Sequence, residues 1–484
     1  MLVAIIAVLF CTSTAHAAIW YVHPDSALNT IQIGLNSCDN DDTVLVGPGV
    51  YYENIIWPNT QGINLVSEYG TDTTIIDGDS AGTVITIIAG VDSTTIIDGF
   101  TIQHGSSGQY GGGIQCSASA PAIMNNIIRE NFGGGTVWTP GGGIGCLSAS
   151  PIITSNLITD NTAYYGGAIG CCDATPLVTN NTINNNTSYS GGGIFFIHDS
   201  PNISNNTVSG NIASEFGGGI YCHNALPIIT NNTITENAAN YGGGISCFYE
   251  CARTSTDKTV SEGDKGTVYG QKSPYNITRN TITANIAFYY GGGISCILAS
   301  LSITNNIITG NSADSGGGIA CILGSSTINR CTISNNNGDG VYCSALASPV
   351  ISYNDIINNM GYGIRNVDSM VVISAEYNWW GDSTGPYHPD FNPGGLGDTV
   401  SDYVDFDPWL YNPWGIEEGP VVKPVEHQNT IGATIFRGPL HLPESKKCKV
   451  FDITGRVVEP DKIRPGIYFI EVDGVVTQKV VKVR

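Results

Sequence analysis

The chain has 484 residues, of which 61 are glycine and only 12% are charged, and its formal net charge is −22. This composition excludes a helical protein rich in Lys and Glu. The absence of a basic patch argues against nucleic acid or an anionic membrane surface as a partner. After the N-terminus, no run is long and apolar enough to predict a transmembrane helix.

The first 17 residues are predicted to be a secretory signal peptide. They form an apolar run that ends in Ala15-His16-Ala17, the small-residue pattern that precedes signal-peptide cleavage. We therefore expect the mature protein to start near residue 18 and to be secreted or held at the outer cell surface.

A block of glycines followed by an aliphatic residue recurs along the chain. The stretch YGGGISC occurs at Tyr241–Cys247 and again at Tyr290–Cys296. Between such blocks lie motifs like PIITNNTITEN (Pro227–Asn237), whose short runs of Ile, Val and Thr predict strands. A period of about 25 residues with three strands per repeat predicts a solenoid, in which each coil buries its apolar side by stacking on its neighbours.

One asparagine occupies an equivalent place in successive repeats. In a parallel stack, identical side chains lie above one another about 4.8 Å apart, so their amides can form a hydrogen-bonded ladder. The glycine block is expected to form a corner with positive φ or with close approach between coils. The ladder positions are Asn126, Asn156, Asn181, Asn206, Asn232, Asn280, Asn306 and Asn354, with Cys331 between the last two.

The segment Asp25–Ile56, the repeats and the segment Asn378–Leu410 together resemble the pectate-lyase-like superfamily. The glycine blocks are also similar to the repeats of chlamydial polymorphic outer-membrane proteins, which are surface adhesins. The resemblance implies an all-β fold: a right-handed parallel β-helix over residues 18–410 with an N-terminal capping helix. It does not imply one activity, because this fold supports many.

A linker at residues 411–424 precedes a different unit at residues 425–484, predicted to be a small C-terminal β-sandwich. Its strand-like runs are Lys447–Val458, Arg464–Gly474 and Gln478–Arg484. They resemble the type A C-terminal sorting domain of the type IX secretion system. The resemblance implies that the type IX machinery exports the chain and that the tail is then removed. An ordinary terminal β-domain is the alternative.

Cysteines occupy one inward position in successive repeats, and Phe196 interrupts the row. They are interpreted as small buried packing residues. Disulfides between neighbours remain an alternative, although parallel Cβ vectors suit them poorly. No metal site is expected, because no histidine or CxxC spacing accompanies the row. The row comprises Cys116, Cys146, Cys171, Cys222, Cys247, Cys296, Cys321 and Cys343.

An aromatic residue often precedes the glycine corner. Aromatic rings stacked in successive coils are candidates for a platform that binds sugar rings. The alternative is a ladder that only packs one corner of the solenoid. The candidate ligand-binding residues are Tyr110, Tyr165, Phe216, Tyr241 and Tyr290, with Tyr164 and Tyr289 beside them.

Ionisable residues replace the usual small ones on the turn after the glycine-block strand in four neighbouring repeats. An insertion, Cys251–Ser273, follows this edge and contains basic residues. Carboxylates, imidazoles and an arginine would suit acid–base chemistry on an acidic polysaccharide. The alternative is a solvated edge beside a polar loop. The candidate catalytic residues are Asp173, His198, Asp199, His223, Glu250 and Arg253.

The catalytic signatures of the pectate-lyase-like enzymes are absent, apart from a misplaced Asp41-Asp42. The sequence therefore predicts an adhesin-like monomer that binds a polysaccharide or a cell-surface glycan without catalysis and without an evident cofactor. The alternatives are a polysaccharide lyase or glycoside hydrolase, the lyase with Ca²⁺ as its cofactor, and a purely structural surface shaft.

Overall fold

The computed structural model describes residues 17–88, 90–108, 110–134, 140–249 and 276–414, together with short C-terminal segments (434–436, 448–452, 456–460, 462–463, 466–472 and 475–482). Almost all of the expected signal peptide and the insertion Cys251–Ser273 lie outside the described residues.

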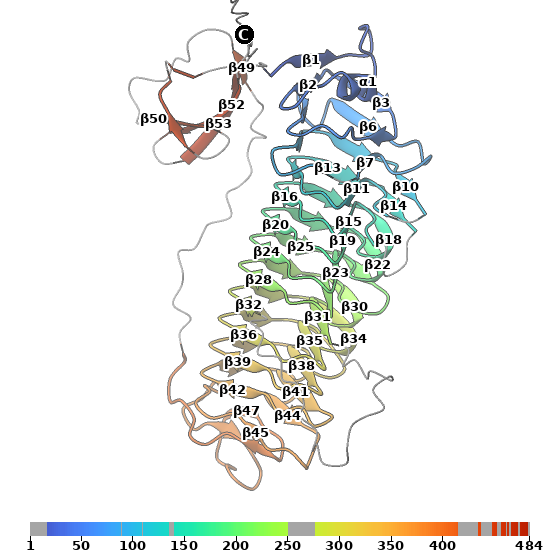
Figure 1. The fold of residues 1–484 in the computed structure, drawn as a ribbon. Coiled ribbons are helices and arrows are strands. Elements are labelled where there is room, and N and C mark those ends of the chain that lie inside the picture. Colours follow the sequence, from blue (N-terminus) through green and yellow to red (C-terminus); the bar gives the residue numbers. More distant parts are fainter. Residues whose placement is uncertain are drawn as a thin grey trace, which may run out of the picture.

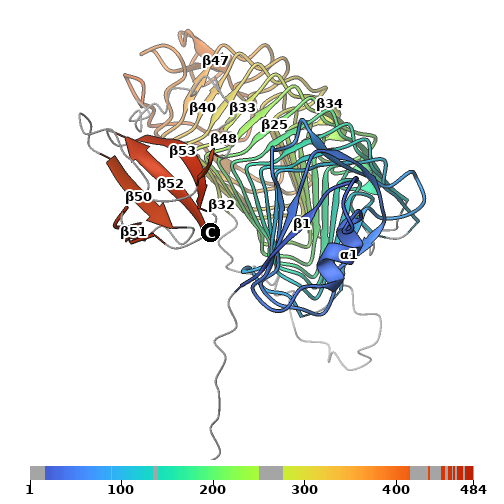
Figure 2. The ribbon, with the colours of Figure 1, turned by 90° about the horizontal axis from the view of Figure 1, so that it is seen from above.

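Residues from β1 (Ile19–Val22) to β48 (Val404–Asp405) form a solenoid of stacked coils (Figure 1). Strands pair in parallel with their equivalents in the next coil, in register apart from a bulge between β30 and β34. Figure 2 shows the coils stacked one behind another. The solenoid predicted from the repeat is therefore confirmed. It follows from strands that are apolar on one side only and that bury this side inside the coil.

Four sheets run along the solenoid in its described part. Sheet A has 15 strands, from β1 to β48. Sheet B has 12 strands, from β3 (Gly49–Tyr52) to β43 (Asp355–Ile357), and sheet C has 12, from β4 (Ile55–Ile56) to β44 (Ile364–Asn366). Sheet D has seven, which are β10 (Ser106–Ser107), β14 (Phe132–Gly133), β18 (Thr162–Tyr165), β22 (Thr187–Ser190), β26 (Ile212–Ala213), β30 (Ala238–Tyr241) and β34 (Ile286–Tyr290).

One coil shows the order in which the chain visits the sheets. It passes through β20 (Leu177–Thr179) in sheet A, β21 (Thr182–Asn184) in sheet B, β22 in sheet D and β23 (Ile194–Ile197) in sheet C. The sequence predicts three strands per coil, and this is wrong for the coils that contain sheet D. The fourth strand lies directly before the glycine corner, and its sequence in this coil, TSYS, contains no Ile, Val or Leu, so it resembled a connection.

Inward side chains of sheets A, B and C form one continuous apolar core. The central residues of neighbouring sheet A strands, such as Val178, Ile203 and Ile229, are completely buried. β-Branched residues suit these positions because they pack well on a pleated surface.

The predicted asparagine ladder is present at the corner between sheets A and B. The Nδ2 atom of Asn206 donates to Oδ1 of Asn232 at 3.0 Å and to the carbonyl of Val178 at 2.9 Å. A second ladder, which was not predicted from the sequence, follows the corner between sheets B and D. Its members are Asn131, Asn161, Asn186, Asn211, Asn237, Asn285, Asn311, Asn336 and Asn359.

The glycine block forms the corner between sheets D and C, as predicted. Gly191 has φ 70°, and a Cβ at Gly192 would lie 2.4 Å from the carbonyl oxygen of Gly218 in the next coil. Only glycine fits a backbone that approaches its neighbour this closely.

The interval of 49 residues between Ile245 and Ile294 is one coil plus an insertion. β31 (Ile245–Phe248) pairs directly with β35 (Ile294–Ile297) in sheet C, and β28 (Ile228–Thr230) pairs with β32 (Asn276–Thr278) in sheet A. The coils on both sides of the insertion therefore stack without interruption.

The N-terminal end of the solenoid carries the expected helix, α1 (Ile31–Asn36). The carboxylate of Glu53 accepts hydrogen bonds from the amides of Ile31 and Gln32, which are otherwise unsatisfied at a helix start. Among the described residues, no helix is long and apolar enough to span a membrane.

The described part of the C-terminal region forms one five-stranded sheet. Its pairs are antiparallel, except that β49 and β53 are parallel. The buried side chains Val450, Tyr468 and Ile470 pack together on it. The strands, in sheet order, are β49 (Thr434–Phe436), β53 (Val475–Lys482), β52 (Gly466–Val472), β50 (Cys448–Asp452) and β51 (Val457–Val458).

Candidate functional site

Sheet D carries the exposed aromatic residues of the middle of the solenoid. Between Gly105 and Gly338, the described aromatic side chains that are exposed to solvent all belong to its strands. They are Phe132, Tyr164, Tyr189, Phe288 and Tyr289. Figure 1 shows most strands of this sheet along one edge of the solenoid. We call this surface the aromatic face.

Two pairs of rings dominate the aromatic face. Tyr164 on β18 and Tyr189 on β22 stack with centroids 4.9 Å apart and an interplanar angle of 16°. Phe288 and Tyr289 on β34 meet edge to face at 4.7 Å, where a β-bulge places one residue more on β34 than on β30. We refer to these pairs as the first and the second aromatic plate.

A polar pair lies between the plates. The backbone amide of Glu215 donates to the carbonyl of Tyr189, so Glu215 follows the first plate in the next coil. The side-chain amide of Asn240, one coil further, donates to the Glu215 carboxylate at 3.3 Å. Burial and the nearby Glu215 charge raise the pKa of Tyr189 and Tyr241. The plates are therefore joined by hydrogen-bonding groups with a negative charge.

A shallow depression of about 470 Å³ adjoins the second plate. Its lining includes Ile286 and Phe288 of β34 and, from the following coils, Ser312, Asp314 and Asn337. The side-chain amide of Asn337 donates to the Ser312 hydroxyl at 3.0 Å. The depression thus combines an aromatic wall with a carboxylate and an amide.

The aromatic row predicted from the sequence lies beside this face, at the corner between sheets D and C. Tyr241 contacts Phe216 and Tyr290 at centroid distances of 5.0 and 5.9 Å. Tyr165 and Phe216 also pack on Phe195 and Tyr221, which point outward from sheet C yet are buried. Tyr110 lies two coils before Tyr165. The rings of the row pack together, and whether they bind a ligand stays a prediction.

The structure brings only part of the predicted catalytic edge together. His198 Nδ1 lies 3.7 Å from Oδ1 of Asp173, and both side chains are partly exposed. His223 lies next to Tyr221 and contacts the ring of Phe248 at 5.4 Å. Glu250 and Arg253 lie outside the described residues.

Asp199 does not lie on the exposed edge that the sequence predicts. His198 has φ 58°, and this turn directs the following residue inward, where Ala174 and Ala225 occupy the equivalent places in neighbouring coils. One carboxylate oxygen accepts a hydrogen bond from the amide of Ala174, and the other is buried without a hydrogen-bond partner among the described residues. Burial raises the pKa of Asp199 to about 8.

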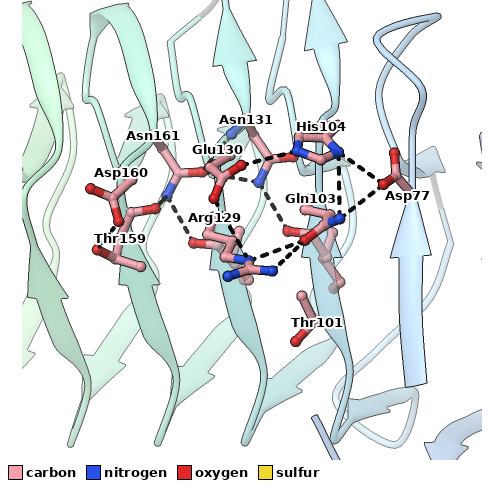
Figure 3. Close-up of polar contacts among 12 residues, drawn as sticks. Asp77, Thr101, Gln103, His104, Arg129, Glu130, Asn131, Thr159, Asp160 and Asn161 are labelled. Atoms are coloured by element: carbon pink, nitrogen blue, oxygen red, sulfur yellow. Dashed lines mark hydrogen bonds and ion pairs between the residues drawn. The ribbon is translucent and has the colours of Figure 1, made fainter. Parts of the chain in front are cut away.

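A charged network on sheet B was not predicted. The imidazole of His104 lies between Asp77 and Glu130, with Nδ1 2.8 Å and Nε2 3.0 Å from their carboxylates (Figure 3). Gln103 donates to Asp77 and accepts two hydrogen bonds from Arg129. The residues in contact are 26 or 27 positions apart in the sequence. This separation is close to one repeat period, which is the only signal in the sequence that could have indicated the contact. The charged side chains of this network therefore pair with one another.

The predicted cysteine row is confirmed as an inward column. Cys222, Cys247 and Cys296 occupy the same register position in neighbouring strands and are nearly fully buried. The cysteines that the structure describes are free thiols. Within the described ranges, no three His, Cys, Asp or Glu side chains are arranged to hold a metal ion.

Two protein-family models match the solenoid. One is described as periplasmic copper-binding protein (NosD) and matches residues 217–378. The other is described as right handed beta helix region and matches residues 140–282. The coils are thus similar to right-handed β-helix repeats, which supports the handedness predicted from the sequence.

No match was found among curated proteins. Among solved structures, the catalytic unit of the thermostable GH87 alpha-1,3-glucanase from Streptomyces thermodiastaticus strain HF3-3 is similar at 10% identity and a TM-score of 0.26. The match covers 79% of this chain and 66% of that chain. A likeness of this degree says nothing about the activity of this chain.

Proposed function

We propose that this protein binds a polysaccharide through the aromatic face of sheet D. The observation that carries the proposal is that, between Gly105 and Gly338, the exposed aromatic rings of the described residues all lie on sheet D. Exposed apolar patches with a polar rim mark interaction sites on monomeric proteins. Aromatic rings offer faces to the C–H groups of sugars, while nearby amides and carboxylates bond to the hydroxyl groups.

Binding without catalysis fits the observed geometry. Asp199 is buried and faces the core, so it is not placed to contact a polysaccharide. Asp173 and His198 lie at the far side of sheet C from the aromatic face, since sheet C separates the two corners. A purely structural shaft would not need the middle coils to gather their exposed tyrosines and phenylalanines on sheet D.

Paired substitutions on the aromatic face would test the proposal. Tyr164→Ala/Tyr189→Ala and Phe288→Ala/Tyr289→Ala should each weaken binding to glycans in an immobilised panel by tenfold or more, because each lost ring contact is worth about 1 kcal/mol. The matched control is Leu177→Ala/Ile228→Ala, which removes exposed apolar side chains from sheet A. Equal binding by all three variants would exclude the aromatic face as the binding site.

We also propose that the chain acts outside the cytoplasm and that residues 425–484 are a type IX sorting domain. The resemblance of the C-terminal runs and the sheet they form support this. Mass spectrometry of the exported protein should find that residues 1–17 and most of 425–484 are absent. An exported form that still ends at Arg484 would contradict removal of the tail.

A further inference from the structure

We infer that the glycan bound by the aromatic face is uncharged and that it contacts both aromatic plates at once. This inference rests on the proposed function and specifies the charge and the length of the glycan that is bound. It depends on two observations: the sign of the charges around the plates and the distance between them.

The charges on the aromatic face are negative. Glu215 lies between the plates, and Asp314 lines the depression beside the second plate. The described solenoid has only four Lys or Arg residues, and none lies in a strand of sheet D. They are Arg129 on sheet B, Arg365 on sheet C, and Arg279 and Arg330 at turns after strands of sheet A.

This charge pattern discriminates between classes of sugar. The hydroxyl groups of a neutral sugar can donate hydrogen bonds to Glu215 and Asp314, which accept them as carboxylates. The carboxylates of a uronic acid would instead meet like charges, with no Lys or Arg of the described sheet D strands beside them, and like-charge contacts disfavour a partner. A neutral glycan is therefore the complementary ligand.

The spacing of the plates sets the length of the ligand. Tyr189 is on β22 and Tyr289 is on β34, three strand positions apart in sheet D. At about 4.8 Å per strand, the plates are roughly 14 Å apart along the solenoid axis. One glycan chain lying along this axis passes over Glu215 and Asn240 and reaches both plates. Once the glycan is bound at one plate, its binding to the other plate is intramolecular, which raises the affinity of the protein for the glycan.

The experiment compares neutral and acidic oligosaccharides of matched length. Isothermal titration uses neutral glucan, mannan and galactan oligosaccharides of two to six units, with oligogalacturonides of the same lengths as the acidic probe. We expect at least one neutral series to bind, with tenfold or greater gain in affinity between two and five units. The oligogalacturonides should bind at least tenfold more weakly at low salt.

Two variants separate charge from length. Glu215→Gln/Asp314→Asn should weaken neutral binding severalfold and strengthen binding of oligogalacturonides. Phe288→Ala/Tyr289→Ala should remove the gain with length and retain the weak binding of short sugars at the first plate. All the substituted side chains are at least partly exposed, so the thermal midpoint should stay close to that of the wild type.

The outcomes distinguish failure of this inference from failure of the proposed function. Oligogalacturonides that bind as tightly as neutral sugars, with loss of binding in the plate variants, would overturn the inference and leave the proposed function intact. An affinity that does not change with length would also overturn it. Absence of binding to every neutral and acidic probe would overturn both.

Discussion

The Nδ1 atom of His104 lies 2.8 Å from Oδ2 of Asp77. The second ring nitrogen lies 3.0 Å from Glu130, so both nitrogens face carboxylates and the imidazole is best accommodated with a proton on each. Hydrogen bonding to Asp77 raises the pKa of His104. Asp77 accepts hydrogen bonds from Gln103, from the amide of Asp79 and from His104. Together these bonds outweigh the effect of burial and lower the pKa of Asp77.

We predict that His104→Asn changes how stability depends on pH. Because the pKa of His104 is raised by folding, its stabilisation is fully present below the ordinary histidine pKa and is lost as pH rises through the raised value. The wild type should therefore exceed the variant in thermal midpoint at pH 5.5 by more than at pH 9. Asparagine suits the positive φ of this position, as Asn185 shows in a later coil. A pH-independent difference would contradict this account.

Substitution of Asp199, unlike that of His104, is predicted to stabilise the protein. Burial raises its pKa from the ordinary value to about 8, so the charged form is disfavoured in the folded state. Stability is therefore lost as pH rises from about 4 to 8, by at most about 1.4 kcal/mol per unit. Asp199→Ala, which copies Ala174 and Ala225, should gain stability relative to the wild type over this range. Denaturant unfolding at pH 5 and pH 8 measures it, and a constant difference would contradict the prediction.

The asparagine ladder is predicted to contribute strongly to the stability of the solenoid. Asn206→Ala removes hydrogen bonds to Asn181, Asn232 and Val178 and leaves buried partners unsatisfied. We expect a loss of roughly 3 kcal/mol in the free energy of unfolding. Asn202→Ala, at an exposed position on β24 (Asn202–Ser204), is the control and should change it by less than about 0.5 kcal/mol. Similar effects of the two substitutions would contradict a structural role for the ladder.

The thiol column is predicted to remain reduced and unreactive in the folded protein. Burial shields the thiols, so the native protein should react with much less thiol reagent than the denatured protein, without prior reduction. Cys247→Ala should destabilise by about 1–3 kcal/mol, as expected for truncation of a small core residue. Peptide maps under non-reducing conditions that show neighbouring cysteines joined would reverse this interpretation.

Much of this fold is predictable from the repeat because successive coils place the same residue types at equivalent positions. Residues such as Asn206 and Cys247 recur at intervals close to the repeat period in most coils, and stacking in register places each one above its equivalent. The glycine corner is predictable for the same reason, since Gly191 and Gly192 are needed wherever the chain turns sharply beside the next coil. These features require only the period and the identity of the residue.

Other features depended on the direction in which a side chain leaves the coil. Tyr164 and Tyr165 are adjacent in sequence, yet one is exposed on sheet D and the other packs at the corner, because strand residues alternate between faces. Asp199 faces the core because the residue before it has positive φ. His104 meets Asp77 and Glu130 only when three coils stack. The sequence by itself determined the solenoid and its first asparagine ladder, whereas the tertiary structure decided which side chains face solvent, because strand alternation and positive-φ residues at the turns set the direction in which each side chain leaves the coil.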